Sequence, residues 1–120
     1  MEIEKMIEDT RHFTKSVQDQ LGPQVFSGPQ TLMAELCRVS GSLAGGILVT
    51  EGKRPARSGT TVRLAHDISD VLYILISISD YYHIDLERAW NDLIQEGWGN
   101  LAKLQDMENE TGEMPERGTP

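Results

Sequence analysis

A long run of apolar residues at helical spacing limits the fold of this 120-residue chain more than any other feature. The run is formed by Val62, Ala65, Ile68, Val71, Leu72, Leu75, Ile76 and Ser79. Its centre, Val71 to Ile76, is apolar on every side, and its β-branched residues would also suit a buried strand. The pattern continues for about 20 residues without a turn signal, and this length predicts a helix. We expect such a helix to be buried, both within one subunit and between subunits.

Two more helices are expected before this run. Residues 3–20 carry apolar side chains at intervals of three to four, which predicts an amphipathic helix that ends at a Gly-Pro pair. Ser27 has the chemistry of a helix cap and is followed by a second apolar helical face. We expect this second helix to reach about residue 48, because Gly45 and Gly46 weaken its end.

A fourth helix is expected after the long apolar run. Asp85 precedes a helix-forming segment and is a good N-cap. This helix should reach Glu96, where Gly97 and Gly99 are expected to break or bend it. From residue 108 onward the chain has almost nothing apolar, so we expect a disordered tail.

Four helices and no convincing strand predict an all-α fold, a four-helix bundle. The length suits one domain, which we assign to residues 1–107, followed by the polar tail at 108–120. Residues 51–60, rich in glycine, proline and charge, are expected to form the loop between the second and third helices.

The composition excludes several classes of protein. The formal net charge of −8 argues against nucleic acid as a partner, since binding to its phosphates needs clustered Lys and Arg. No apolar run approaches the roughly 20 residues of a membrane span, and no secretory signal is evident at the N-terminus. Cys37 is the single cysteine, so no internal disulfide can form, and we expect it to be a small buried side chain. Together these features predict a cytoplasmic protein without a membrane partner.

A basic stretch interrupts this acidic chain. Residues 38–63 hold five basic side chains against one acid, for a local net charge of +4. A solvated loop would account for this stretch, and so would a loop that faces a phosphate ligand. The five candidate phosphate-binding residues are Arg38, Lys53, Arg54, Arg57 and Arg63.

Three acidic residues could form a metal site. Glu35 lies on the second predicted helix, while Asp67 and Asp70 share one face of the third. Three carboxylates that converge from two helices would suit Mg²⁺, with Mn²⁺ as an alternative, and such an ion could polarise a phosphoryl group. The competing interpretation is structural: Asp67 stabilises a helix start, and Asp70 pairs with Arg63 or Arg38.

Three segments resemble the MazG-type nucleoside triphosphate pyrophosphohydrolase superfamily. They read LMAELCRVSGSL from Leu32, HDISDVLYIL from His66 and HIDLERA from His83, and the resemblance covers about residues 30–96. It implies an all-α fold, a homodimer or homotetramer, and Mg²⁺-dependent conversion of a nucleoside triphosphate to monophosphate and pyrophosphate. It also implies that Glu35, Asp67 and Asp70 are the metal-binding and catalytic residues.

The chain departs from the family pattern at several motif positions. Asp67 replaces a glutamate, and other residues stand at four further positions, namely Ala34, Arg38, Leu93 and Gly97. A cation at Arg38 would repel Mg²⁺ and pair with Glu35, or would itself hold phosphate in place of the metal.

Three hypotheses about function follow. The first is a pyrophosphohydrolase with weakened or altered activity. The second is a catalytically inactive protein that binds a nucleotide or has a regulatory role on the same helical scaffold. The third is a purely structural helical oligomer. The fold alone cannot choose among them, because function depends on the site.

Overall fold

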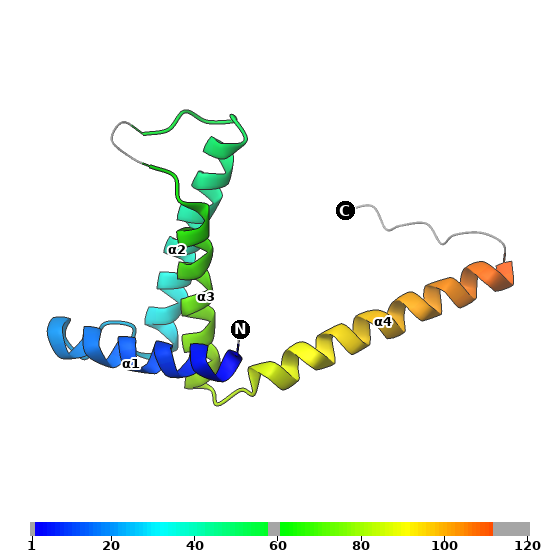
Figure 1. Cartoon of the computed structure of the whole chain (residues 1–120), viewed down its shortest axis with the longest axis horizontal. Coiled ribbons are helices and arrows are strands. Elements are labelled where there is room, and N and C mark those ends of the chain that lie inside the picture. Colours follow the sequence, from blue (N-terminus) through cyan, green and yellow to red (C-terminus); the bar gives the residue numbers. More distant parts are fainter. Residues whose placement is uncertain (1, 58–60, 112–120) are drawn as a thin grey trace. The chain divides into compact units, whose positions relative to one another are not determined.

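The computed structural model describes residues 2–57 and 61–111, and all the regular structure in these two ranges is helical (Figure 1). The helices are α1 (Ile3–Leu21), α2 (Gly28–Thr50), α3 (Leu64–Tyr81) and α4 (Leu86–Thr111). Four helices without a strand in the described ranges confirm the all-α prediction.

The chain divides into two compact units, each of which is described by itself below. Residues 1–84 form the first unit and contain α1, α2 and α3, and residues 85–120 form the second, which contains α4. The single domain over residues 1–107 stays a prediction, and so does disorder in the part of the 108–120 tail that follows helix α4. Residues 112–120 lie outside the described part of the chain.

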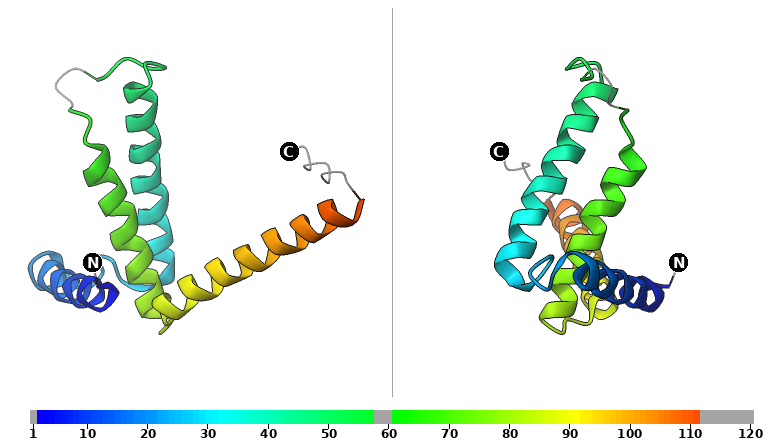
Figure 2. Two further views of the ribbon diagram at one scale, coloured as in Figure 1. Left: turned by 45° about the vertical axis from the view of Figure 1, so that its right-hand side comes forward. Right: turned by 90° about the vertical axis from the view of Figure 1, so that its left-hand side faces the viewer.

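An antiparallel hairpin of α2 and α3 forms the centre of the first unit. The two helices run side by side in all views (Figures 1 and 2). Leu32 and Val39 from α2 and Ile74 from α3 are almost fully buried where the helices meet. Leu32 and Val39 are seven residues apart, about two helical turns, so both lie on the side of α2 that faces α3.

Helix α1 lies across the end of the hairpin that is farther from the α2–α3 loop (Figure 1). The ring of Tyr73 on α3 contacts α1 and the connection between α1 and α2. It makes edge contacts with Phe13 of α1, at 5.7 Å between ring centroids, and with Phe26 of the connection, at 5.4 Å. Its hydroxyl also forms a hydrogen bond with Thr14 of α1. Aromatic contacts of this geometry add to the burial of the rings, so Tyr73 stabilises the docking of α1.

An ion pair also joins α1 to α3, in addition to the aromatic contacts of Tyr73. Arg11 of α1 donates hydrogen bonds from Nε and Nη2 to the carboxylate of Asp80 on α3, with the shortest contact at 2.6 Å. These hydrogen bonds lower the pKa of the Asp80 carboxyl from its ordinary value, although partial burial opposes them. The same contact raises the pKa of Arg11.

The predicted break in the last helix is wrong. Helix α4 continues through Gly97 and Gly99 to Thr111, so it also includes the first residues of the segment expected to be disordered. Each glycine in a helix interior costs only about 1 kcal/mol relative to alanine, and the surrounding Leu, Ala, Glu and Lys residues favour helix. The backbone hydrogen bonds of the helix therefore persist across the two glycines.

Helices α2 and α4 begin directly after Ser27 and Asp85, the two residues expected to cap them. The side chain of Asp85 accepts a hydrogen bond from the backbone N–H of Arg88 at 3.1 Å, which confirms its role as an N-cap. Ser27 occupies the N-cap position of α2, but its hydroxyl donates to the carbonyl of Gln24 instead of accepting from the helix. Helix α2 then runs to Thr50, slightly beyond the predicted end.

By length and composition alone, α2 is apolar enough to cross a membrane, and it is the one such helix among the described residues. The core helix of a soluble protein has the same length and composition, so these two properties do not distinguish α2 from such a helix. The cytoplasmic location and the lack of a membrane partner stay predictions.

The Arg11–Asp80 pair predicts a pH-dependent stability. Because the pKa of Asp80 is lower in the folded than in the unfolded chain, its ionised form stabilises the fold above the unfolded pKa of about 4. This contribution is lost as the pH falls through the lower, folded pKa. Asp80→Asn should therefore destabilise the protein at pH 7 and have little effect near pH 2.

Urea unfolding followed by circular dichroism at both pH values measures this difference. Asp9→Asn is the matched control, since Asp9 pairs with Lys5 on the exposed side of α1 and should matter less. An effect of Asp80→Asn that is equal at both pH values would contradict the prediction.

Candidate functional site

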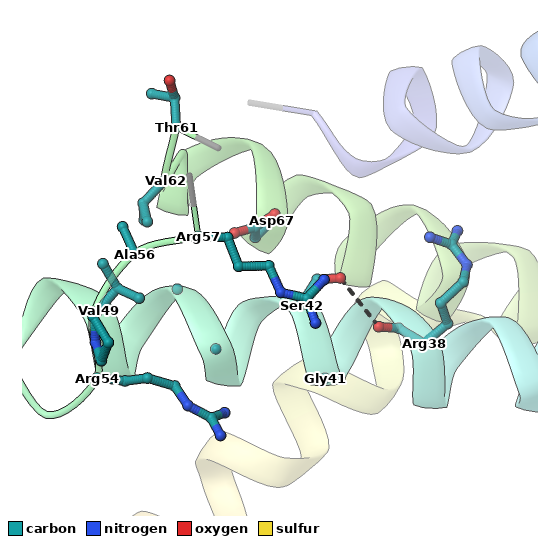
Figure 3. Close-up of a pocket in the computed structure, with 13 residues that line it drawn as sticks. Arg38, Gly41, Ser42, Val49, Arg54, Ala56, Arg57, Thr61, Val62 and Asp67 are labelled. Atoms are coloured by element: carbon teal, nitrogen blue, oxygen red, sulfur yellow. Dashed lines mark hydrogen bonds between the residues drawn. The ribbon is translucent and has the colours of Figure 1, made fainter. Parts of the chain in front are cut away.

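A pocket of about 800 Å³ lies where the α2–α3 loop leaves and re-enters the hairpin (Figure 3). Its floor is a side of α2 with small residues, including Gly41, Ser42 and Gly45. A Cβ atom added at Gly41 or Gly45 would meet nothing within 4 Å, so the space above this part of α2 is open. The pocket can therefore admit a ligand against the helix surface.

Three of the five predicted phosphate-binding residues line this pocket. Arg38 comes from α2, and Arg54 and Arg57 come from the loop that follows it (Figure 3). Lys53 and Arg63 belong to the same basic stretch but do not line the pocket. Within the described residues neither Arg54 nor Arg57 forms an ion pair, so both guanidinium groups can bind an anion.

Asp67 is the single acid among the residues that line the pocket. It comes from the first turn of α3 and reaches toward α2, opposite Gly46 (Figure 3). Of the three predicted metal ligands, it is the one that the structure places among the arginines.

Glu35 is engaged by Arg38 on the same helix. The Nε and Nη2 groups of Arg38 both donate to Oε2 of Glu35, at 2.9 and 2.7 Å. The predicted pairing of these two residues is thus confirmed. Since Arg38 also lines the pocket, its ion pair with Glu35 fixes the position of one of the three guanidinium groups of the pocket.

Asp70 lies beside a histidine. Its carboxylate is 3.4 Å from Nε2 of His66, one helical turn earlier on α3, and its side chain is 45% exposed. The structural interpretation that pairs Asp70 with Arg63 or Arg38 is wrong, because neither arginine contacts it. The Asp70–His66 contact becomes an ion pair only when the histidine is protonated.

The three predicted ligands do not form one metal centre in the chain as described. Asp67 faces Gly46 across the hairpin. Glu35 lies 11 residues before Gly46 on α2, and Asp70 lies 3 residues after Asp67 on α3, so both lie farther from the α2–α3 loop. At 1.5 Å per residue, Glu35 and Asp70 are about 12 Å apart along the helix axes. No group of three His, Cys, Asp or Glu residues in the described ranges is arranged to hold an ion.

Gly46 is the residue at this site whose role was missed. A Cβ atom at Gly46 would lie 3.0 Å from Leu64, 3.1 Å from the carboxylate of Asp67 and 3.4 Å from Val62. The missing side chain lets the start of α3 approach α2 and brings Asp67 to the pocket. The sequence analysis interprets Gly45 and Gly46 only as residues that weaken the end of the helix. The signal for the packing role of Gly46 is its position seven residues after Val39, which places it on the core side of α2.

The comparisons leave the family open. No model of a known protein family matches this chain, and neither the curated proteins nor the solved structures contain a match. The resemblance to MazG-type enzymes is therefore carried by the motif residues alone.

The two adjacent glycines of α2 give a sharp test of this packing. Gly46→Val should destabilise the protein by about 1–3 kcal/mol, because the new side chain is forced against Leu64 and Asp67. Gly45→Val is the matched control: it points into open space, and valine has a better helix propensity than glycine, so stability should hardly change. Urea unfolding of both variants measures the difference, and equal effects would contradict the assigned role.

Proposed function

We propose that this chain binds the phosphate groups of a nucleotide in the interhelical pocket, and that it is a MazG-like nucleoside triphosphate pyrophosphohydrolase with lowered activity. The observation that carries the proposal is the set of Arg38, Arg54, Arg57 and Asp67 around one open pocket. Three guanidinium groups complement a polyphosphate, and the carboxylate lies at a motif position that the resemblance assigns to catalysis.

The arginines would bind and orient the phosphate chain. Planar guanidinium groups donate paired hydrogen bonds to phosphate oxygens, and here they come from two directions, the helix and the loop. Arg54 and Arg57 offer all their donors, whereas Arg38 has donors left after two are used on Glu35.

A magnesium ion fits this pocket only in part. A preassembled site of three carboxylates does not fit, since Glu35 is paired with Arg38 and Asp70 lies beside His66. Mg²⁺ is, however, often bound through one or two carboxylates together with substrate phosphates, and Asp67 is available for this role. When bound, the ion would supply Lewis-acid polarisation of a phosphoryl oxygen and a lower pKa for a bound water.

Asp67 would also position the attacking water. A carboxylate accepts hydrogen bonds from water and can take up a proton as the water attacks phosphorus. Asp67 is half-buried and lines the same pocket as the three arginines, so a water beside the bound phosphates would lie within reach of its carboxylate.

A second candidate function has its own support. The Arg38–Glu35 pair neutralises one motif acid and places a cation where the family has an acid, which favours a nucleotide-binding or regulatory protein without turnover. Nucleotide binding with no pyrophosphate release from the wild-type protein would select this candidate. The reverse change, Ala34→Glu with Arg38→Glu, should then raise Mg²⁺ affinity by restoring two acids.

The phosphate contacts predict a clear split within the basic stretch. Arg57→Gln should weaken the binding of tripolyphosphate about tenfold or more, because each hydrogen bond between charged groups contributes about 1.5–3 kcal/mol. Lys53→Gln and Arg63→Gln remove the same charge outside the pocket and should weaken binding only a few-fold, by about 0.5 kcal/mol. Isothermal titration calorimetry at one salt concentration measures all three, and equal losses would indicate a solvated loop without a site.

Catalysis is tested by pyrophosphate release from a panel of canonical and modified nucleotides with Mg²⁺ or Mn²⁺. Asp67→Asn should lower kcat/KM by about 100-fold, the usual loss for a group that handles the proton. Asp70→Asn, a matched change one turn away and outside the pocket, should retain most of the activity. Activity that survives Asp67→Asn would remove Asp67 from the proposed mechanism.

A further inference from the structure

The pocket at the α2–α3 loop has groups that suit a phosphate chain and few that suit a nucleobase. Its charged side chains are three arginines and one aspartate (Figure 3). Apart from glycines, the other lining residues are apolar or carry a hydroxyl group, namely Ser42, Val49, Pro55, Ala56, Thr61 and Val62. Among the lining residues that the structure describes there is no aromatic ring, carboxamide or imidazole.

Recognition of a base depends on side chains of these missing kinds. Aromatic rings stack on the face of a base and strengthen binding by about 5- to 150-fold per base. Side chains with a fixed pattern of donors and acceptors, such as Asn and Gln, distinguish one base edge from another. In the proposed function the charged groups of the pocket are used on the phosphates and on water, so they do not serve this purpose.

The remaining lining groups do not distinguish one base from another. A hydroxyl both donates and accepts, so Thr61 would pair with a donor or an acceptor equally well. The hydroxyl of Ser42 already donates to the carbonyl of Arg38, at 3.4 Å. The apolar side chains of Val49, Ala56 and their neighbours offer contact area without hydrogen bonds.

The sequence of the α2–α3 loop extends this argument to positions that the structure does not describe. Residues 51–63 read EGKRPARSGTTVR, without an aromatic residue, a histidine or a carboxamide. Residues 58–60 lie within this segment, so they add no side chain that stacks on a base.

The shape of the pocket also suits a linear chain of phosphates. On α2 its lining extends from Arg38 to Val49, a rise of about 16 Å along the helix. Between these ends, a Cβ atom at Gly41 or Gly45 would meet nothing within 4 Å, so the helix surface is open there. The side chain of Arg57 extends over this surface from the loop toward Ser42 (Figure 3).

We propose that inorganic tripolyphosphate is a substrate of this pocket, and that it binds as tightly as any nucleoside triphosphate. The pocket contacts the phosphate chain, and the group attached to that chain contributes little to binding. This inference rests on the proposed function, since it takes the three arginines as the phosphate contacts.

The reaction needs no reactant besides water. The oxygen of a water molecule forms a bond to a terminal phosphorus of tripolyphosphate. The bond from that phosphorus to the bridging oxygen breaks, and the bridging oxygen leaves as part of pyrophosphate. Asp67 takes one proton from the water, and the other stays on the orthophosphate that forms. A nucleoside triphosphate would release the same pyrophosphate leaving group.

Calorimetric titration of the wild-type chain tests the binding. Tripolyphosphate, ATP, GTP, CTP and UTP, compared with Mg²⁺ at one salt concentration, should have dissociation constants within about threefold of one another. A nucleotide that binds at least about tenfold tighter than tripolyphosphate would overturn the inference and leave the proposed function standing. If none of the five ligands binds, the proposed function itself is wrong, and the inference falls with it.

Arg57→Gln checks that both kinds of ligand use the same contacts. It should weaken tripolyphosphate and ATP by the same factor, because the pocket binds only the part that they share. A loss for tripolyphosphate that exceeds the loss for ATP by more than about threefold would show that the nucleoside supplies contacts of its own, and would overturn the inference.

Turnover is tested by orthophosphate and pyrophosphate release from tripolyphosphate with Mg²⁺. The value of kcat/KM should lie within about fivefold of that for ATP, and Asp67→Asn should lower both by the same factor. Pyrophosphate release from ATP that depends on Asp67, without hydrolysis of tripolyphosphate, would overturn the inference alone. Hydrolysis of neither compound would remove the substrate role together with the proposed enzymatic activity.

Discussion

The close approach of α2 and α3 at Gly46 is the constraint on which the rest of the first unit depends. Without a side chain at this position, Leu64 and Asp67 can lie directly against α2. This contact sets the register of the antiparallel hairpin, so it also decides which residues meet further along. Leu32, Val39 and Ile74 are buried in that same register.

Once the register is set, the hairpin has two sides with different chemistry. One side carries α1, the pocket and its three arginines, and the other exposes apolar side chains that include Met33, Ile68 and Leu75. The net charge of −8 does not describe the surroundings of the pocket, because the basic residues are concentrated between 38 and 63 and most of the acids lie outside this stretch. Local charge around the pocket, and not the total, decides which ligand the chain can attract.

The candidate site could be predicted in part. The Arg38–Glu35 pair follows from the sequence, because a spacing of three on a helix brings opposite charges together whatever surrounds them. The separation of Glu35 from Asp70 could not be predicted, since it depends on how far α3 is shifted along α2. The same shift selects Arg54 and Arg57 for the pocket and leaves out Lys53 and Arg63.

The sequence by itself determined the helices, the capping role of Asp85 and the local pairs, because these depend on residues within a few positions of one another. The continuation of α4 through Gly97 and Gly99 is local as well, but the predicted break gave these two glycines more weight than the sum of the surrounding helix propensities. Only the tertiary structure decided that Asp67 joins the arginines while Glu35 and Asp70 lie apart, and that Cys37 is exposed. The physical reason is that these outcomes depend on the register and facing of two helices, which the packing at Gly46 fixes across a separation of about 20 residues in the chain.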